Sequence, residues 1–187
     1  MNSGVRTGLM DAIAAVEDVG GQYAIMGGLA VRAYGIPRPT FDVDLLMLLD
    51  RGSLTELFDQ LEQRGYGIDE PYRRGWVDEV GEMPLVKAKV YLQTGSVDLD
   101  LYLCEGDFLE SVMRRRQKVD VEGTILWLIS PEDLLLFKLM AARTKDWTDI
   151  FDVLFVVSNL DRSYIEHWVE VLKLTERWRS ALEKGPF

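Results

Sequence analysis

Apolar and polar residues alternate with distinct periods along the first quarter of the chain. A helical period is followed by a short apolar run bounded by glycines, which is typical of a buried strand. Gly27-Gly28 then permits a tight turn, and a loop with Pro37 and Pro39 leads into a second apolar run. The pattern predicts a helix over Leu9–Val19, a strand over Tyr23–Met26, a short helix over Leu29–Tyr34 and a strand over Phe41–Leu48.

The middle of the chain continues with helix and strand signals. Ser53 and Glu56 form a capping box that opens a helix, and Gln93-Thr94-Gly95 suits the turn of a hairpin. The stretch 68–81 has no clear period. We expect helices over Leu54–Arg64 and Phe108–Arg116, strands over Leu85–Leu92 and Ser96–Leu103, and a last strand over Thr124–Leu128 extended by the Val119–Val121 arm.

Helical patterns alone fill the last third of the chain. Ser130 and Pro131, followed by two acids, form a strong helix start. The expected helices are Leu134–Ala142, Thr148–Ser158, Tyr164–Leu172 and Glu176–Lys184. The order predicts an α+β protein, in which a small mixed sheet flanked by helices (residues 1–128) precedes a C-terminal helical lobe (residues 129–187).

Composition narrows the function classes. The 187 residues carry a net charge of −10, which argues against broad, nonspecific nucleic-acid binding. The basic run Arg114–Arg116 with Lys118 is either a solvated helix end or a local groove. A single cysteine excludes a disulfide framework. No apolar run is long enough to cross a bilayer and no secretory signal is visible, so we expect a cytoplasmic protein with no membrane association.

Two acids interrupt the apolar strand that follows the glycine turn. Asp42 and Asp44 lie on one face of a strand because alternate residues share a face. Two such carboxylates can hold a divalent cation, with nucleotide phosphates completing its ligands. The alternative is an exposed strand face, although acids are depleted in strands.

A third carboxylate is expected from the strand Ser96–Leu103. Asp98 and Asp100 share the face opposite the apolar one, and the sequence leaves open which of them joins Asp42 and Asp44, although we favour Asp100. Three carboxylates would suit a two-metal site, where one ion holds a triphosphate and the other activates the attacking hydroxyl.

Together these motifs resemble those of a known group of enzymes. Gly27-Gly28, then R38-x-T40-x-D42-x-D44 and a later strand Asp, are similar to the nucleotidyltransferase superfamily related to DNA polymerase beta. Lys138 and the segment R143-T-K-D146-W-T-D149 add a resemblance to minimal nucleotidyltransferases and abortive-infection AbiEii-like toxins. The resemblance implies an NTP substrate, Mg²⁺ or Mn²⁺, and metal ligation by Asp42, Asp44 and Asp100.

The same resemblance suggests roles for further residues, each with a plainer alternative. It places Gly27, Gly28, Arg38, Thr40, Lys138 and Arg143 at the nucleotide and Asp146 among the catalytic residues. An ammonium within an apolar helix is costly, so a triphosphate would compensate Lys138, unless its side chain reaches solvent. Asp146 could instead stabilise a helix start, and Arg38 and Thr40 could orient Asp42.

Three functions fit these residues. The first is transfer of a nucleoside monophosphate from an NTP to a protein or tRNA hydroxyl, as by a toxin with an antitoxin partner. The second is a nucleotide-binding regulatory module without turnover. The third is a small-molecule adenylyltransferase of the antibiotic-modifying type. The complete carboxylate set favours an enzyme over the second.

Overall fold

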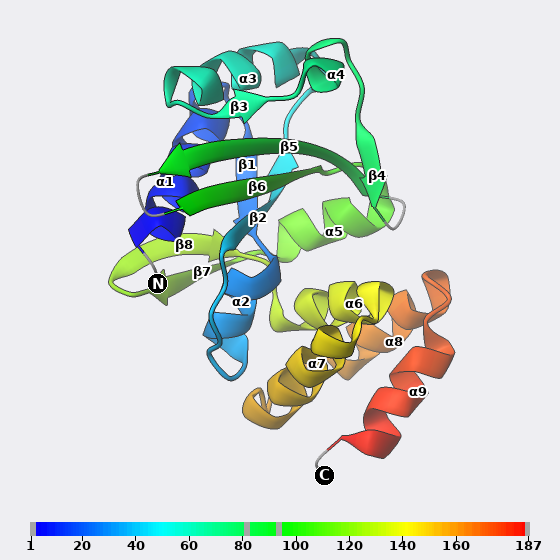
Figure 1. The fold of residues 1–187 in the computed structure, drawn as a ribbon. Helices are drawn as coiled ribbons and strands as arrows, with labels where there is room; N and C mark the ends of the chain where they lie inside the picture. The colour runs from blue at the N-terminus through cyan, green and yellow to red at the C-terminus, as the bar shows by residue number, and fades with distance from the viewer. Residues whose placement is uncertain (1–2, 81–82, 93–94, 186–187) are drawn as a thin grey trace.

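A mixed β-sheet with helices on both faces forms the centre of the protein (Figure 1). The computed structural model describes residues 3–80, 83–92 and 95–185. Within them the strands are β1 (Gln22–Ile25), β2 (Asp42–Leu48), β3 (Gly67–Ile68), β4 (Asp78–Val80), β5 (Met83–Leu92), β6 (Gly95–Leu103), β7 (Gln117–Val121) and β8 (Thr124–Leu128).

Helices alternate with these strands and then follow them. They are α1 (Ser3–Asp18), α2 (Gly27–Tyr34), α3 (Leu54–Gln63), α4 (Glu70–Arg73), α5 (Asp107–Arg115), α6 (Pro131–Ala141), α7 (Thr144–Val156), α8 (Arg162–Val171) and α9 (Thr175–Lys184), with a 3₁₀ turn at Arg51–Ser53. No described helix combines the length and the apolar character that crossing a membrane would require.

The strand order is β3-β5-β6-β2-β1-β8-β7, with β4 paired to β5. Strands β2 and β6 run parallel, as do β1 and β8, whereas β1–β2, β5–β6 and β7–β8 are antiparallel. Strands β2 and β6, which carry the aspartates expected at the site, are neighbours in the sheet although they lie far apart in the chain. Their parallel pairing aligns their carboxyl-bearing faces.

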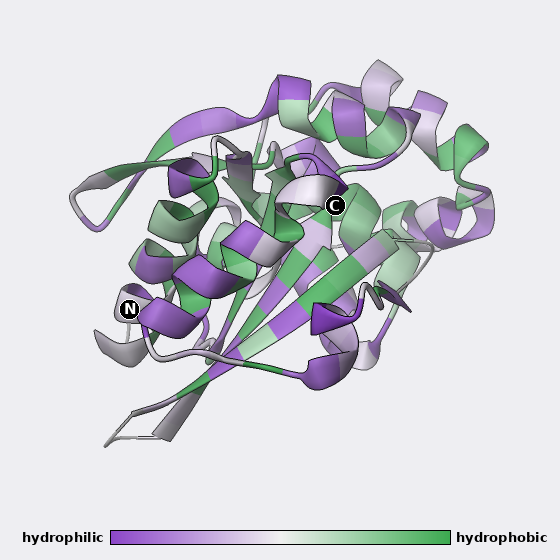
Figure 2. Cartoon of the chain, turned by 90° about the horizontal axis from the view of Figure 1, so that it is seen from above, coloured by the Kyte–Doolittle hydropathy of each residue, from purple (hydrophilic) through white to green (hydrophobic). Residues whose placement is uncertain are grey.

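Alternation along the strands divides the apolar residues between two cores. One face packs against α1 and α3, through side chains such as Val43 and Leu99. The other face packs against α2, α5 and the C-terminal helices, through side chains such as Leu46 and Tyr102. Figure 2 shows green and purple residues alternating along the central strands. The expected fold class, a mixed sheet with a helical C-terminal part, is confirmed.

The two-lobe division at residue 128 stays a prediction. The second core joins α2 and α5, which lie before residue 128, to α6 through α9. Helices from both sides of that boundary thus share one apolar layer against the sheet.

Three local expectations differ from the structure. Helix α7 begins at Thr144 rather than Thr148, because the Asp146 carboxylate accepts a hydrogen bond from the backbone N–H of Arg143 at 3.1 Å and caps the helix there. The stretch 68–81, which lacks a clear period, contains α4 and β4. The Val119–Val121 arm belongs to a strand of its own, β7, which turns back on β8.

Positive φ angles at Glu122 and Gly123 explain this last difference. Both residues have φ above +50°, at 53° and 83°, as a two-residue turn of type I′ requires. Such a turn folds β7 back antiparallel to β8 instead of prolonging it. The other expected hairpin turn, at Gln93-Thr94, lies outside the described residues, although its strands β5 and β6 pair as expected.

Candidate active site

The carboxylates of β2 and β6 share one face at the middle of the sheet. Parallel pairing sets Asp44 opposite Asp100 and Asp42 opposite Asp98. Asp100 is partly buried, whereas Asp98 is exposed and forms an ion pair with Lys89 on β5 at 2.8 Å. Register gives both acids an aspartate of β2 as a neighbour, but Asp100 is the partly buried one, and Asp98 already has a cationic partner outside this group.

The glycine turn fits closely against the same carboxylates. Gly27 has φ +61°, and a Cβ added there would overlap Asp44 Oδ2. A Cβ on Gly28 would lie 2.5 Å from Thr40 Oγ1. These residues open α2, whose first N–H groups favour negative charge. Only glycine fits at either position, because a side chain would collide with Asp44 or Thr40. At Gly27 the positive φ angle favours glycine as well.

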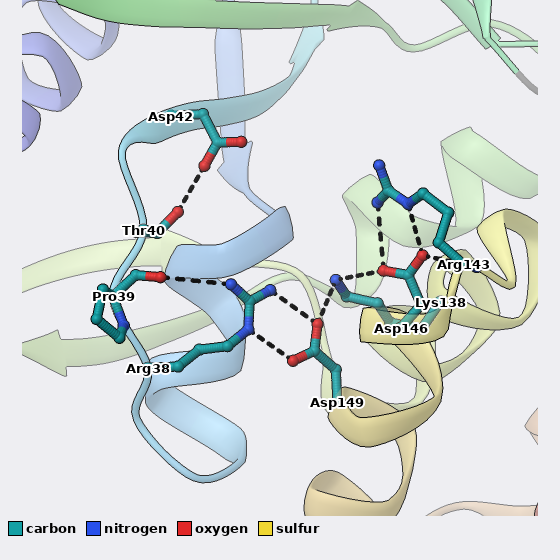
Figure 3. Close-up of polar contacts among 8 residues, drawn as sticks. All are labelled: Arg38, Pro39, Thr40, Asp42, Lys138, Arg143, Asp146 and Asp149. Carbon is teal, nitrogen blue, oxygen red and sulfur yellow. Dashed lines mark hydrogen bonds and ion pairs between the residues drawn. The ribbon is translucent and has the colours of Figure 1, made fainter.

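Thr40 supports the first carboxylate from behind. Its Oγ1 donates a hydrogen bond to Asp42 Oδ1 at 2.5 Å (Figure 3). The geometry matches the plainer alternative considered for Thr40, an orienting residue for Asp42. A contact of Thr40 with a nucleotide stays a prediction.

Burial and neighbouring negative charge raise the pKa values of Asp44 and Asp100. Burial, together with the negative charges of Asp42 and Asp100, raises the pKa of Asp44 to about 7. Lys138 and a hydrogen bond from the Gly28 backbone act in the opposite direction. Burial also raises the pKa of Asp100, while Lys87 on β5 lowers it. Asp42, Asp44 and Asp100, which we call the acidic wall, therefore lack enough positive charge nearby to keep all three carboxylates readily ionised. The effect is large at Asp44.

A cationic wall faces the carboxylates from α6, α7 and the loop after α2. Lys138 on α6 is buried, and its Nζ lies 3.0 Å from Asp146 Oδ1 and 2.7 Å from Asp149 Oδ2 (Figure 3). Two buried carboxylates of α7 therefore compensate this ammonium. The ammonium is thus compensated inside the protein without a triphosphate or solvent, and a contact of Lys138 with a nucleotide stays a prediction.

Two arginines complete the cationic wall. Arg38 donates two parallel hydrogen bonds to Asp149, from Nε at 2.8 Å and from Nη2 at 2.9 Å. The Arg143 Nε donates to Asp146 Oδ2 at 2.7 Å. Burial alone would raise the pKa values of both aspartates, but the hydrogen bonds from these arginines and from Lys138 outweigh it and lower them. Asp146 and Asp149 are therefore ionised.

A cavity of about 380 Å³ separates the two walls. Its lining combines apolar side chains with the charged residues described above. The lining residues are Met26, Gly27, Gly28, Arg38, Asp42, Asp44, Met83, Asp100, Tyr102, Leu134, Phe137, Lys138, Met140, Ala141, Arg143 and Lys145.

Most residues expected at the site from sequence do meet at this cavity. Thr40 and Asp146 are the exceptions. Thr40 hydrogen-bonds to Asp42 and Asp146 to Lys138, but neither Thr40 nor Asp146 lines the cavity itself. Sequence reasoning missed Lys145, Tyr102 and the contacts of Asp149. The spacing of Asp149, three residues after Asp146 on one helical face, was the available signal for the last.

The donor set fits a divalent cation. Asp42, Asp44 and Asp100 offer oxygen ligands on one sheet face, and their mutual repulsion is what a hard cation relieves. In the described part of the chain, no three His, Cys, Asp or Glu side chains already form a metal-binding group. A cation would therefore have to draw these carboxylates together.

Two arginines of the basic run at the end of α5, Arg115 and Arg116, pack against aromatic rings of the protein. The Arg115 guanidinium stacks 3.9 Å from the centre of the Tyr164 ring and pairs with Glu132 at 3.4 Å. Arg116 lies over the ring of Trp127, 4.7 Å from its centre. These contacts favour a packing role over a nucleic-acid groove.

Comparison with family models matches residues 8–181 to the family described as "Nucleotidyltransferase of unknown function (DUF6036)". The match spans the sheet, the cavity and the C-terminal helices. No curated protein matches the chain.

Solved structures share the fold over nearly the whole chain. The antibiotic-resistance factor ANT(2'')-Ia is 19% identical with a TM-score of 0.58, covering 98% of this chain and 97% of that one. An antigenic nucleotidyltransferase-like protein from Paracoccidioides brasiliensis is 20% identical with a TM-score of 0.50, covering 98% and 94%. The lincosamide adenylyltransferase LnuA, solved with lincomycin bound, is 18% identical with a TM-score of 0.50, covering 84% and 98%. At sequence identities of 18–20%, these structures show that the fold is shared, and nothing more about this chain.

We expect Gly27→Ala to destabilise the protein more than Gly20→Ala. Both positions have positive φ, but a Cβ at Gly20 meets open space whereas one at Gly27 meets the Asp44 carboxylate. Each change should cost about 1 kcal/mol for the backbone, and Gly27→Ala about 2 kcal/mol more for overpacking. Urea unfolding of the two variants measures the difference, and equal losses would contradict the close approach.

Replacing Asp44 with Asn should stabilise the cation-free protein, increasingly so at higher pH. A folded pKa of about 7 lies above the ordinary 3.8, so wild type loses stability as pH rises between these values, and Asn does not. The gain should be small near pH 4 and reach up to about 4 kcal/mol near pH 8. Urea unfolding with EDTA across this range tests it. A gain that is constant with pH would refute the raised pKa.

Lys138→Met should destabilise the protein, with Lys145→Met as the matched control. The first change leaves two buried carboxylates without their shared ammonium, which should cost about 3 kcal/mol. Lys145 is exposed at the cavity and makes no ion pair within the described residues, so its replacement should change stability by less than about 0.5 kcal/mol. Thermal and urea unfolding compare the two. Similar stability of both variants would show that the buried network contributes little.

Proposed function

The chain belongs to the nucleotidyltransferase family of unknown function (DUF6036), and from that premise we propose a specific activity. The protein transfers a nucleoside monophosphate from an NTP to a hydroxyl group, with Mg²⁺ or Mn²⁺ bound by Asp42, Asp44 and Asp100. One observation carries the proposal: carboxylates and cationic side chains face each other across one cavity beside the glycine turn.

The two walls suit the two ends of a transfer reaction. The triphosphate is anionic, so Arg38, Lys138 and Arg143 attract it, and the N–H groups at the start of α2 can contact its oxygens. Asp42, Asp44 and Asp100 would hold the divalent cations, whose positive charge would stabilise the transferred phosphate and favour loss of the proton of the attacking hydroxyl. The hydroxyl oxygen would take the place of pyrophosphate on the transferred phosphorus, and pyrophosphate would leave. Gly27 keeps the backbone close enough for the phosphates to reach both walls.

Protein residues also restrain the reacting groups. Thr40 fixes one oxygen of Asp42, and the β2–β6 register fixes Asp44 beside Asp100. Preset positions of this kind favour in-line transfer because little reorganisation remains when the substrates bind. Asp146, expected among the catalytic residues, is occupied by Lys138 and Arg143, so we assign it a supporting role behind the cavity.

For the acceptor, a protein or a small-molecule hydroxyl suits the charge distribution better than tRNA. The net charge is −10, and Arg115 and Arg116 already stack on aromatic rings of the protein itself, which disfavours an extended polyanion. Small-molecule adenylyl transfer is the second candidate, because two antibiotic-modifying enzymes share this fold over almost their full length. A toxin role with an antitoxin partner remains a prediction from sequence resemblance.

Labelled nucleotides test the proposal directly. The protein is incubated with each α-³²P-labelled NTP, with Mg²⁺, Mn²⁺ or EDTA, and with cell protein, total tRNA or a panel of amine-bearing polyols. A labelled product that requires the divalent cation supports transfer and identifies the acceptor class. Cation-dependent nucleotide binding without any labelled product would favour a regulatory module instead.

Asp100→Asn should abolish this transfer, whereas Asp98→Asn should leave it within about threefold of wild type. Asp100 lines the cavity beside Asp44, while Asp98 is exposed and paired with Lys89. Loss of a metal ligand should lower the rate by at least about a hundredfold. Initial rates at saturating NTP and cation measure both variants. The reverse pattern would mean that Asp98 is the third ligand.

A further inference from the structure

We propose that Asp149 is the positioning residue that sets the cationic wall of the cavity, by holding Arg38 and Lys138 at fixed places. This inference rests on the proposed function and adds a residue to it that touches neither the triphosphate nor the cations. Asp149 acts through the two basic side chains, and through Arg38 it also reaches the loop that carries Asp42.

The contacts of Asp149 use both of its oxygens. Oδ1 accepts from Arg38 Nε at 2.8 Å, and Oδ2 accepts from Arg38 Nη2 at 2.9 Å. Lys138 Nζ lies 2.7 Å from the same Oδ2. The Asp149 side chain is only 1% exposed. Figure 3 shows its carboxylate between the two basic side chains, with Arg38 on one side and Lys138 on the other.

Asp149 joins three segments that are far apart in sequence. It lies on α7, Lys138 lies on α6, and Arg38 lies in the loop between α2 and β2. Four residues after Arg38 the loop enters β2 at Asp42, where Thr40 already donates to that carboxylate. By holding Arg38, Asp149 therefore also restrains the loop that leads to Asp42, and so the position of that carboxylate.

Asp146 cannot take over this role. Its oxygens accept from Lys138 and from the side chain and backbone of Arg143, and it caps the start of α7. No such contact reaches Arg38, which is one third exposed and lies in a loop. Without Asp149, Arg38 would lose its two hydrogen bonds to a carboxylate. Its guanidinium would then turn toward solvent and be repelled by the charge of Lys138.

An amide cannot reproduce the arrangement. In the Asp149→Asn variant the amide oxygen could still accept one hydrogen bond, but the NH₂ group would face a donor of Arg38 or Lys138. The basic side chains would remain in the cavity while their placement was lost. We therefore expect catalysis to suffer more than nucleotide binding, since transfer depends on alignment and affinity depends largely on the charge present.

The test compares Asp149→Asn with Asp152→Asn in the complete chain. Asp152 lies one turn further along α7, and its carboxylate makes no hydrogen bond or ion pair within the described residues. Its charge still acts on Arg38 and Asp149 through space, so the control removes the same charge near the same groups but breaks no direct contact. Calorimetric titration with ATP and Mg²⁺ gives the fraction of protein that binds nucleotide. Rates divided by that fraction exclude an effect of unfolded protein.

For Asp149→Asn we expect kcat per binding site to fall roughly ten- to a hundredfold, with KM for the NTP changed less than about threefold. Asp152→Asn should keep both values. Because Asp149 acts partly through Arg38 and partly through Lys138, adding Asp149→Asn to an Arg38→Ala protein should lower kcat by a smaller factor than it does in the wild-type protein. The loss of kcat in the double variant would then be smaller than the product of the two single losses, as expected if Asp149 acts by positioning Arg38.

Two results would overturn the inference. A kcat per binding site equal to wild type in Asp149→Asn would show that the hold on Arg38 and Lys138 does not matter for transfer. Full additivity with Arg38→Ala would show that Asp149 does not act through Arg38, which the inference requires. The proposed function fails in a different way, if wild-type protein shows no cation-dependent transfer to any acceptor class.

Discussion

A buried ammonium between two buried carboxylates is the interaction on which this site depends. Lys138 is held by Asp146 and Asp149, and each aspartate is also paired with an arginine that lines the cavity. Isolated charges at such depth would be costly, so each member is stable only because the others are present. The network thereby joins α6, α7 and the loop before β2, and it gives the cavity a cationic wall before any ligand binds.

The opposite wall lacks this internal balance. Asp44 lies beside Asp42 and Asp100, and the pKa of its carboxyl is raised to about 7 because burial and like charge both oppose ionisation. Arg38, Lys138 and Arg143 outnumber the two aspartates that pair with them, so this side of the cavity keeps a net positive charge, while Asp42, Asp44 and Asp100 make the other side negative. In the function that we propose, the first side would attract the phosphate groups and the second would hold the divalent cations.

Burial and close contact, rather than residue type, decide which acids belong to the site. Asp98 and Asp100 share a strand face, and each lies opposite an aspartate of β2 and a lysine of β5. Asp98, however, is exposed and forms an ion pair with Lys89, whereas Asp100 is partly buried and lines the cavity. In the same way Asp146 and Asp149 are equivalent on a helical face, but only Asp149 is reached by Arg38. Such distinctions depend on contacts between segments that are remote in the chain.

The sequence by itself determined the local features of this protein. Alternation placed Asp42 and Asp44 on one strand face, glycines marked the turn before α2, and helix periods separated the C-terminal helices from the sheet. Only the tertiary structure decided the partner of Lys138, the start of α7 at the Asp146 cap, and the pairing of Asp149 with Arg38. The physical reason is range: backbone periodicity is set by neighbours in the chain, whereas charge compensation is set by whichever groups folding brings within hydrogen-bond distance.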